Sequence, residues 1–166
     1  MEIYLLRHGV AAERGTRGVT EEQRPLTPEG AAKMRAAAEG MKKLGVEFDA
    51  LLTSPLVRAR QTADIVASVY GARGRLKELP ALRAGAPREK LWSALKLLAD
   101  ARRLMLVGHE PDLSELASVL LTGKPDGLNL QLKKGGLCFI EINSLPPQGR
   151  GQLCWLLSSK QLRLMS

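Results

Sequence analysis

Short apolar runs alternate with amphipathic stretches along the first 122 residues, and this alternation limits the folds open to the chain. Four of the runs are too short for helices and predict buried strands, at residues 2–7, 48–53, 75–79 and 103–107. Apolar residues at helical spacing follow them and predict four helices, which begin at Thr27-Pro28, Ser54-Pro55, Pro87 and Glu110-Pro111. In the first two helices, Thr27 and Ser54 are the expected caps.

The end of the chain departs from this alternation. Residues 137–142 and 152–157 predict two more strands, and the loop 144–151 joins them without a helix, so they are expected to pair antiparallel. A length of 166 residues suits one compact domain. We therefore expect a single domain over residues 1–166, an α/β fold built as a three-layer α/β/α sandwich with a mostly parallel mixed sheet.

The chain is basic, with 25 Lys and Arg against 17 Asp and Glu and a formal net charge of +8. Such a charge favours anionic partners, among them nucleic acid, acidic membranes and phosphate compounds. The basic residues are dispersed, and four of the six aromatic residues lie in apolar periodic segments, namely Tyr70, Trp92, Phe139 and Trp155. Few stacking platforms for bases remain, and nucleic acid is not an expected partner.

No apolar run approaches the roughly 18 residues of a membrane span, and Met1–Leu6 lacks the pattern of a signal peptide. We therefore expect a cytoplasmic protein without a membrane partner. Its two cysteines, Cys138 and Cys154, have no CxxC spacing and are expected to be buried and reduced. Two cysteines and two histidines without metal-motif spacing give no reason to expect a metal.

The two histidines each follow an apolar strand, in Arg7-His8-Gly9 and in Gly108-His109. In open α/β sheets, ligands bind at the carboxyl ends of the strands, so one site could hold both side chains. A histidine at a strand end can also simply cap a hydrogen-bond network. Because both histidines of the chain occupy such a position beside a glycine, a functional role is the favoured interpretation.

Arginines accompany these histidines. Arg7 precedes His8 directly, and Arg58 falls in the first turn of the helix that follows the second strand. Helix side chains lean toward the N-terminus, so Arg58 is expected to reach the same sheet edge, where its paired donors suit phosphate oxygens. Arg60 is expected on the surface, while Arg24 is open to a structural or a phosphate-binding role. Histidine with arginines and without a metal cage suits phosphoryl transfer, in which a neutral imidazole attacks phosphorus.

Four segments in order resemble the motifs of the histidine phosphatase superfamily, the phosphoglycerate mutase-like proteins. They are Leu6–Gly9, Arg24–Gly30, Ser54–Ala63 and Val107–Pro111. A lone Arg-His-Gly would be weak evidence, whereas four ordered segments between residue 3 and about residue 122 are strong. The short length and the sequence Arg24-Pro25-Leu26-Thr27 are most similar to the SixA-type phosphohistidine phosphatases of bacteria.

The resemblance implies a phosphoglycerate mutase-like fold in which His8 is the nucleophile and is phosphorylated during turnover. It also implies that Arg7, Arg58 and His109 hold the phosphoryl group, with Arg24 adding to that pocket in the SixA-type branch. Water would then hydrolyse phospho-His8. No metal or organic cofactor is expected.

The sequence departs from the superfamily where many members have a glutamate as general acid after the third strand. Glu78 is the one carboxylate in that region and the candidate for this role, although its place in a short strand favours a surface position. An imidazole that is protonated on its far nitrogen leaves as a neutral molecule, whereas an alkoxide needs a proton. A site without a strong acid therefore favours phosphoramidates over alkyl phosphates.

The sequence is also short between Gly85 and Gly108, where about 24 residues leave little material to cover a site. A phosphohistidine-bearing protein is therefore the favoured substrate. A small phosphorylated metabolite is the nearest alternative, and a non-catalytic module that binds phosphate or nucleic acid is another. The oligomeric state stays open, and the sequence is compatible with a monomer.

Overall fold

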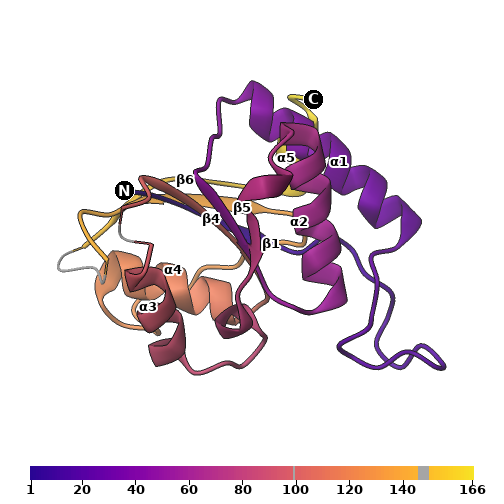
Figure 1. The fold of residues 1–166 in the computed structure, drawn as a ribbon, viewed down its shortest axis with the longest axis horizontal. Helices are drawn as coiled ribbons and strands as arrows, with labels where there is room; N and C mark the ends of the chain where they lie inside the picture. The colour runs from indigo at the N-terminus through magenta and orange to yellow at the C-terminus, as the bar shows by residue number, and fades with distance from the viewer. Residues whose placement is uncertain (99, 146–149) are drawn as a thin grey trace.

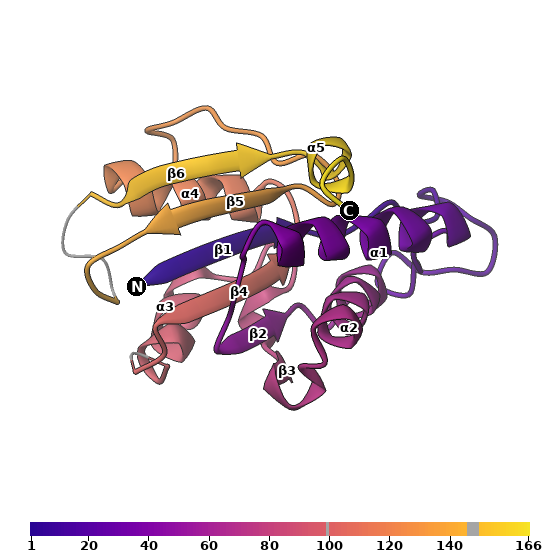
Figure 2. The same cartoon turned by 90° about the horizontal axis from the view of Figure 1, so that it is seen from above.

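A computed structural model describes the chain except for residue 99 and residues 146–149. In the described residues, six strands form one sheet in the order β3-β2-β4-β1-β5-β6. Figure 2 shows the strands side by side, with β3 and β6 at the two edges. The strands are β1 (Glu2–Arg7), β2 (Ala50–Thr53), β3 (Leu76–Glu78), β4 (Arg103–Gly108), β5 (Leu137–Glu141) and β6 (Gln152–Leu157).

The sheet is mixed, as the sequence predicts. Strands β1 to β4 are parallel where they pair, whereas β5 runs antiparallel to β1 and β6 antiparallel to β5. Of the predicted loop between β5 and β6, residues 146–149 lie outside the described residues. In the parallel part, the carboxyl ends of β1, β2 and β4 lie together on the same side of the sheet, which we call its carboxyl edge.

Helices cover both faces of the sheet, which confirms the three-layer α/β/α arrangement (Figure 1). On one face, α1 (Pro28–Lys43), α2 (Val57–Tyr70) and α5 (Ser159–Arg163) contribute to one hydrophobic cluster. On the other face, α3 (Arg88–Lys96) and α4 (Asp112–Thr122) contribute to a second cluster. Neither of these helices, nor any other in the described chain, combines the length and the apolar character that a membrane crossing requires.

The central strand β1 explains why the sheet is buried on both sides. Tyr4 and Leu6 join the cluster under α1 and α2, whereas Ile3 and Leu5 join the cluster under α3 and α4. Because side chains alternate along a strand, an apolar run without polar interruptions is suited to a sheet covered on both faces. Tyr4 also stacks on Phe139 with ring centroids 4.6 Å apart, so aromatic rings here serve the protein's own core.

The ends of the elements follow local chemistry. Thr27 caps α1 as predicted, and its hydroxyl accepts from the Gly30 N–H at 2.9 Å. The prediction that Ser54 caps the second helix was wrong, because α2 begins at Val57 with Leu56 at its N-cap and no side-chain cap. The short helix α5 has no counterpart among the predicted elements. Of the two cysteines, both free, Cys138 is buried as expected and Cys154 is only half-buried.

Candidate active site

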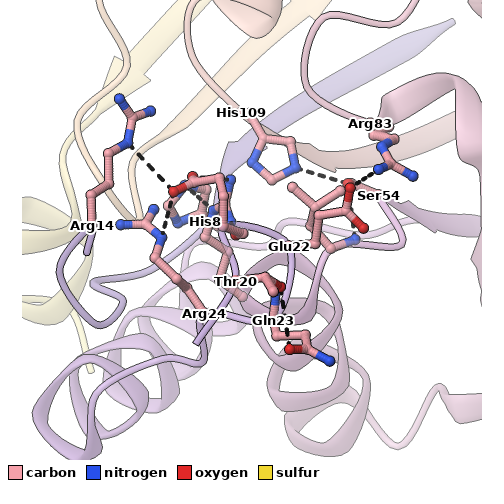
Figure 3. Close-up of polar contacts among 12 residues, drawn as sticks. His8, Arg14, Thr20, Glu22, Gln23, Arg24, Ser54, Arg83 and His109 are labelled. Atoms are coloured by element: carbon pink, nitrogen blue, oxygen red, sulfur yellow. Dashed lines mark hydrogen bonds and ion pairs between the residues drawn. The ribbon is translucent and has the colours of Figure 1, made fainter. Parts of the chain in front are cut away.

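The carboxyl ends of β1 and β4 bring the two histidines together. The two strands are parallel neighbours with Arg7 opposite Gly108 in the register. The His8 backbone N–H donates to the Gly108 carbonyl at 3.1 Å, and the centroids of the His8 and His109 rings lie 5.2 Å apart (Figure 3). The sheet register therefore juxtaposes two residues from distant parts of the sequence.

His8 is held as a neutral imidazole whose Nε2 carries no proton. Nδ1 donates to the Gly9 carbonyl at 2.8 Å, and because a carbonyl oxygen only accepts, the proton of the neutral ring is on Nδ1. The lone pair of Nε2 accepts from Arg58 Nε at 3.2 Å. Burial is the main reason that the pKa of His8 falls to about 4, and the charges of Arg58 and Arg7 act in the same direction.

His109 is also buried and neutral. Burial, and after it the neighbouring His8 and Arg58, lowers the pKa of His109 to about 3. Its Nε2 lies 2.8 Å from the Ser54 hydroxyl, which has no other acceptor among the described residues and therefore donates to Nε2. The ring proton of His109 is thus on Nδ1, which is buried without a partner in the described part of the chain. Nδ1 lies on the side of the ring away from Ser54 (Figure 3).

Two arginines flank the histidines from the strand end and from the helix that follows. Arg58 lies in the first turn of α2, only 4% exposed, as expected from the direction in which helix side chains lean. Arg7 donates from Nη1 to the Leu132 carbonyl at 2.8 Å, while its buried Nε has no partner in the described residues. Burial lowers the pKa of both guanidinium groups, which favours a bound anion that restores charge balance.

Arg24 belongs to the same pocket, and a carboxylate links it to the other cations. Glu21 pairs with Arg24 Nε at 3.1 Å, with Arg58 Nη2 at 3.3 Å and with Arg14 Nε at 3.6 Å (Figure 3 labels Arg14 and Arg24). The Glu21 backbone carbonyl also accepts from Arg58 Nη1 at 2.7 Å. Arg24 therefore lines the pocket and also donates to the Ala12 carbonyl at 2.9 Å, a position compatible with either of the two roles left open.

The two histidines and Arg7, Arg24 and Arg58 line one pocket of about 680 Å³, within the usual range for ligand sites. A phosphoryl group fills only part of that volume, which leaves room for the molecule that carries it. Beyond the predicted residues, the lining includes cations and carboxylates that the sequence analysis missed, namely Glu13, Arg14, Glu21, Glu22, Arg83, Glu110 and Lys134.

The signals for the missed residues differ. Glu13 to Glu22 lie in the charged loop before α1, so their place near Arg24 in sequence could have suggested them. Ser54 was interpreted as a helix cap, although it directly follows β2 at the same edge of the sheet as the histidines. Lys134 comes from a remote loop, and only the tertiary structure brings it to the pocket.

Glu78 is not brought to the pocket. Its exposed carboxylate accepts from Arg60 Nη1 at 2.7 Å, and it is absent from the pocket lining. Arg60 lies on the surface, as predicted, and pairs with Asp64 as well. Within the described residues, no group of three or more His, Cys, Asp or Glu side chains is placed to hold a metal ion.

A pair of neutral histidines among guanidinium groups, at the carboxyl edge of an α/β sheet, is the kind of site that handles phosphoryl groups without a metal cage. Residues 3–84 match the histidine phosphatase superfamily (branch 1). The chain belongs to this superfamily, and the comparisons support a phosphatase.

Similar proteins extend this match over the whole fold. An uncharacterised protein of Picosynechococcus sp. is 41% identical over 143 residues, which is 82% of each chain. The phosphohistidine phosphatase SixA of Escherichia coli is 25% identical over 99% of this chain and 98% of its own.

Two solved structures show the same fold. A protein histidine phosphatase SixA complexed with tungstate has a TM-score of 0.83 and 24% identity, and covers 98% of this chain and 99% of its own. A putative α-ribazole-5′-P phosphatase from Escherichia coli has a TM-score of 0.75 and 21% identity, and covers 96% of this chain and 98% of its own. Proteins named for quite different phosphorylated substrates therefore share this architecture.

Proposed function

We propose that this protein is a metal-independent phosphatase that hydrolyses phosphohistidine on another protein through a covalent phospho-His8 intermediate. The observation that carries the proposal is the state of His8. The Nδ1–H of His8 donates to the Gly9 carbonyl, so Nε2 carries no proton. The lone pair of Nε2 lies beside Arg58. A pKa of about 4 keeps this nucleophile neutral at physiological pH.

The reaction takes two steps. In the first, the Nε2 lone pair of His8 forms a bond to phosphorus while the phosphorus–nitrogen bond of the substrate breaks. The bond electrons return to the substrate imidazole, which leaves neutral when its other nitrogen carries a proton. In the second, water attacks phospho-His8, the new phosphorus–nitrogen bond breaks, and phosphate and free His8 result.

The cations and His109 stabilise the phosphoryl group in this scheme. Arg7 and Arg58 supply guanidinium donors, Arg24 adds a third, and the Nδ1–H of His109 supplies a neutral donor. Donors that are already oriented and buried act strongly on the charge of the transferring group, because water does not compete with them.

The preference for a phosphoramidate rests on the leaving group. Glu78 lies outside the pocket. Of the carboxylates that line it, Glu21 and Glu22 are paired with arginines, Glu110 accepts from the Ser114 hydroxyl at 2.8 Å, and Glu13 is exposed. Because a neutral imidazole needs no proton as it leaves, this site suits it better than an alkoxide. The short chain around the pocket supports a side chain on a protein as the substrate.

Labelled phosphohistidine protein, mixed with the enzyme and quenched within milliseconds, tests the mechanism. We expect acid-labile phosphate on His8 and neither labelling nor turnover in His8→Asn. Turnover that persists in His8→Asn would overturn the proposal.

A second candidate function is hydrolysis of a small phosphorylated metabolite with the same residues. The pocket volume of about 680 Å³ and the shared fold of the α-ribazole-5′-P phosphatase favour it. Comparison of kcat/KM for a phosphohistidine protein and for a panel of small phosphate esters separates the two candidates. A preference for one ester over the protein would replace the first candidate with the second.

A further inference from the structure

A second pocket, which we call the basic pocket, lies beside the active site. Its volume is about 180 Å³, and it is lined from α1, α5 and the loop before β5. The lining includes three cations, Lys33, Lys134 and Arg163. Lys134 lines the active-site pocket as well, so one lysine joins the two.

The backbone couples the basic pocket to His8. Gly135, in its wall, donates from its N–H to the Arg7 and His8 carbonyls, each at 3.1 Å. Gly135 has a φ of +69°, and an added Cβ would lie 3.1 Å from the Ser159 Cβ, so glycine is required here. The wall of the basic pocket is therefore anchored on the residue expected to carry the phosphoryl group.

The cations of the basic pocket are incompletely neutralised. Lys33 pairs with Glu29, whose side chain is 76% exposed and does not line the pocket. Lys134 and Arg163 have no ion pair in the described residues, and Arg163 Nε is buried there without a hydrogen-bond acceptor. An anionic group in the pocket would balance the charges of these lining residues.

The pocket also has apolar walls, from Val10 and Met34. A carboxylate on an aliphatic stem fits this combination, because its methylene groups contact Val10 and Met34 while its oxygens meet the cations. A second phosphate on a small substrate would use the cations but not the apolar walls. The lining thus favours an acidic side chain over a second phosphate.

We propose that the basic pocket binds an aspartate or glutamate side chain that lies near the phosphohistidine on the substrate protein. This inference rests on the proposed function, and it assigns part of the net charge of +8 to substrate recognition. It makes acidic residues around the phosphohistidine a determinant of specificity.

An NMR titration tests the pocket without any turnover. The probe is an unphosphorylated histidine peptide flanked by glutamates, compared with the same peptide flanked by glutamines. We expect the acidic peptide alone to shift the amides of Lys33, Gly135 and Ser159, and Arg163→Gln to weaken its binding about 3- to 5-fold. Lys160→Gln is the matched control, because Lys160 lies on the same helix and does not line the pocket. Equal shifts with both peptides would overturn the proposal.

Inorganic phosphate serves as a second probe in the same titration. We expect it to shift active-site amides only. If phosphate binds the basic pocket more tightly than the acidic peptide does, the carboxylate assignment is wrong.

Kinetics with the phosphorylated peptides separates this inference from the proposed function. For the wild type, the KM for the peptide flanked by glutamates is expected to be about 3- to 5-fold lower than the KM for the peptide flanked by glutamines. Arg163→Gln is expected to abolish this difference in KM, and Lys160→Gln is expected to preserve it. Turnover of both peptides with equal KM would overturn the inference alone. Binding of the acidic peptide without any turnover would overturn the proposed function and leave the pocket assignment standing.

Discussion

Arg58 Nε donates to His8 Nε2 at 3.2 Å, so a buried guanidinium holds the nitrogen that we expect to attack phosphorus. The contact joins the first turn of α2 to the end of β1. Because Gly9 fixes the opposite nitrogen of the ring, the imidazole is held from both sides. Arg58 therefore orients the nucleophile and lies where it can also contact the phosphoryl oxygens.

Replacement of Arg58 by lysine is expected to lower kcat/KM for the phosphohistidine substrate by about 10²- to 10³-fold. Lysine keeps the positive charge but loses the planar array of donors that reaches both His8 and Glu21. Steady-state kinetics with Arg60→Lys as control checks this, since Arg60 lies on the same helix and is exposed. An Arg58→Lys enzyme as active as the control would contradict the role.

The sequence identifies the central part of this site for a physical reason. His8 and His109 each close an apolar strand, and two parallel neighbours carry their ends to the same edge. The side-chain lean within a helix was enough to direct Arg58 toward that edge. These are short-range rules, so the residues that obey them could be located without the structure.

The rest depends on tertiary packing. Ser54 follows β2 and is a residue type that often caps helices. However, α2 begins three residues later, and the Ser54 hydroxyl forms a hydrogen bond with His109 instead. Lys134 reaches both pockets from a loop far along the chain. Glu21 likewise pairs with Arg58 of α2 as well as with Arg14 of its own loop, so no local pattern predicts all of its contacts.

Both histidines are expected to stay neutral well below the pH at which an exposed histidine charges. Their pKa values are about 4 for His8 and about 3 for His109, mainly because burial disfavours the imidazolium. Activity that needs neutral His8 is therefore present at neutral pH and lost as the pH falls through about 4. NMR of the imidazole Cε1 groups between pH 8 and pH 4 tests whether either ring becomes charged in that range. Titration midpoints near 6.5, the ordinary value for histidine, would show that the rings are not desolvated.

The same pKa values predict how stability depends on pH. The unfolded chain binds a proton on each histidine near pH 6.5, whereas the folded chain does so only near pH 4 or below. As the pH falls from 6.5, the free energy of unfolding is expected to decrease by about 1.4 kcal/mol per pH unit for each histidine.

Urea denaturation at pH 7.5 and pH 5.5 measures this loss. The double variant His8→Asn, His109→Asn is the control, because it lacks both groups and keeps every carboxylate. If its stability falls as steeply as that of the wild type, the loss has another origin.

Removal of the Ser54 hydroxyl is expected to release the tautomer of His109. Ser54 is fully buried, and its hydroxyl lies 2.8 Å from His109 Nε2. Without this bond the ring proton is shared between both nitrogens, and Ser54→Ala is expected to lower kcat/KM about 10-fold. Nitrogen chemical shifts of His109 report the tautomer directly. Ser114→Ala removes a hydroxyl that bonds Glu110 instead and is expected to leave His109 unchanged.

Neutralisation of Glu21 is expected to strengthen the binding of phosphate. Its carboxylate occupies guanidinium donors of Arg24 and Arg58, at 3.1 and 3.3 Å, that an incoming phosphoryl group would otherwise use. Glu21→Gln keeps the shape of the side chain and removes the competing charge, so the Kd for inorganic phosphate should fall about 3- to 10-fold.

Calorimetry compares this variant with Glu22→Gln, which also lines the pocket but pairs with Arg83. Weaker phosphate binding in Glu21→Gln would instead mean that the carboxylate holds Arg24 and Arg58 in position. The sign of the change in Kd therefore decides whether Glu21 competes with the substrate or supports the residues that bind it.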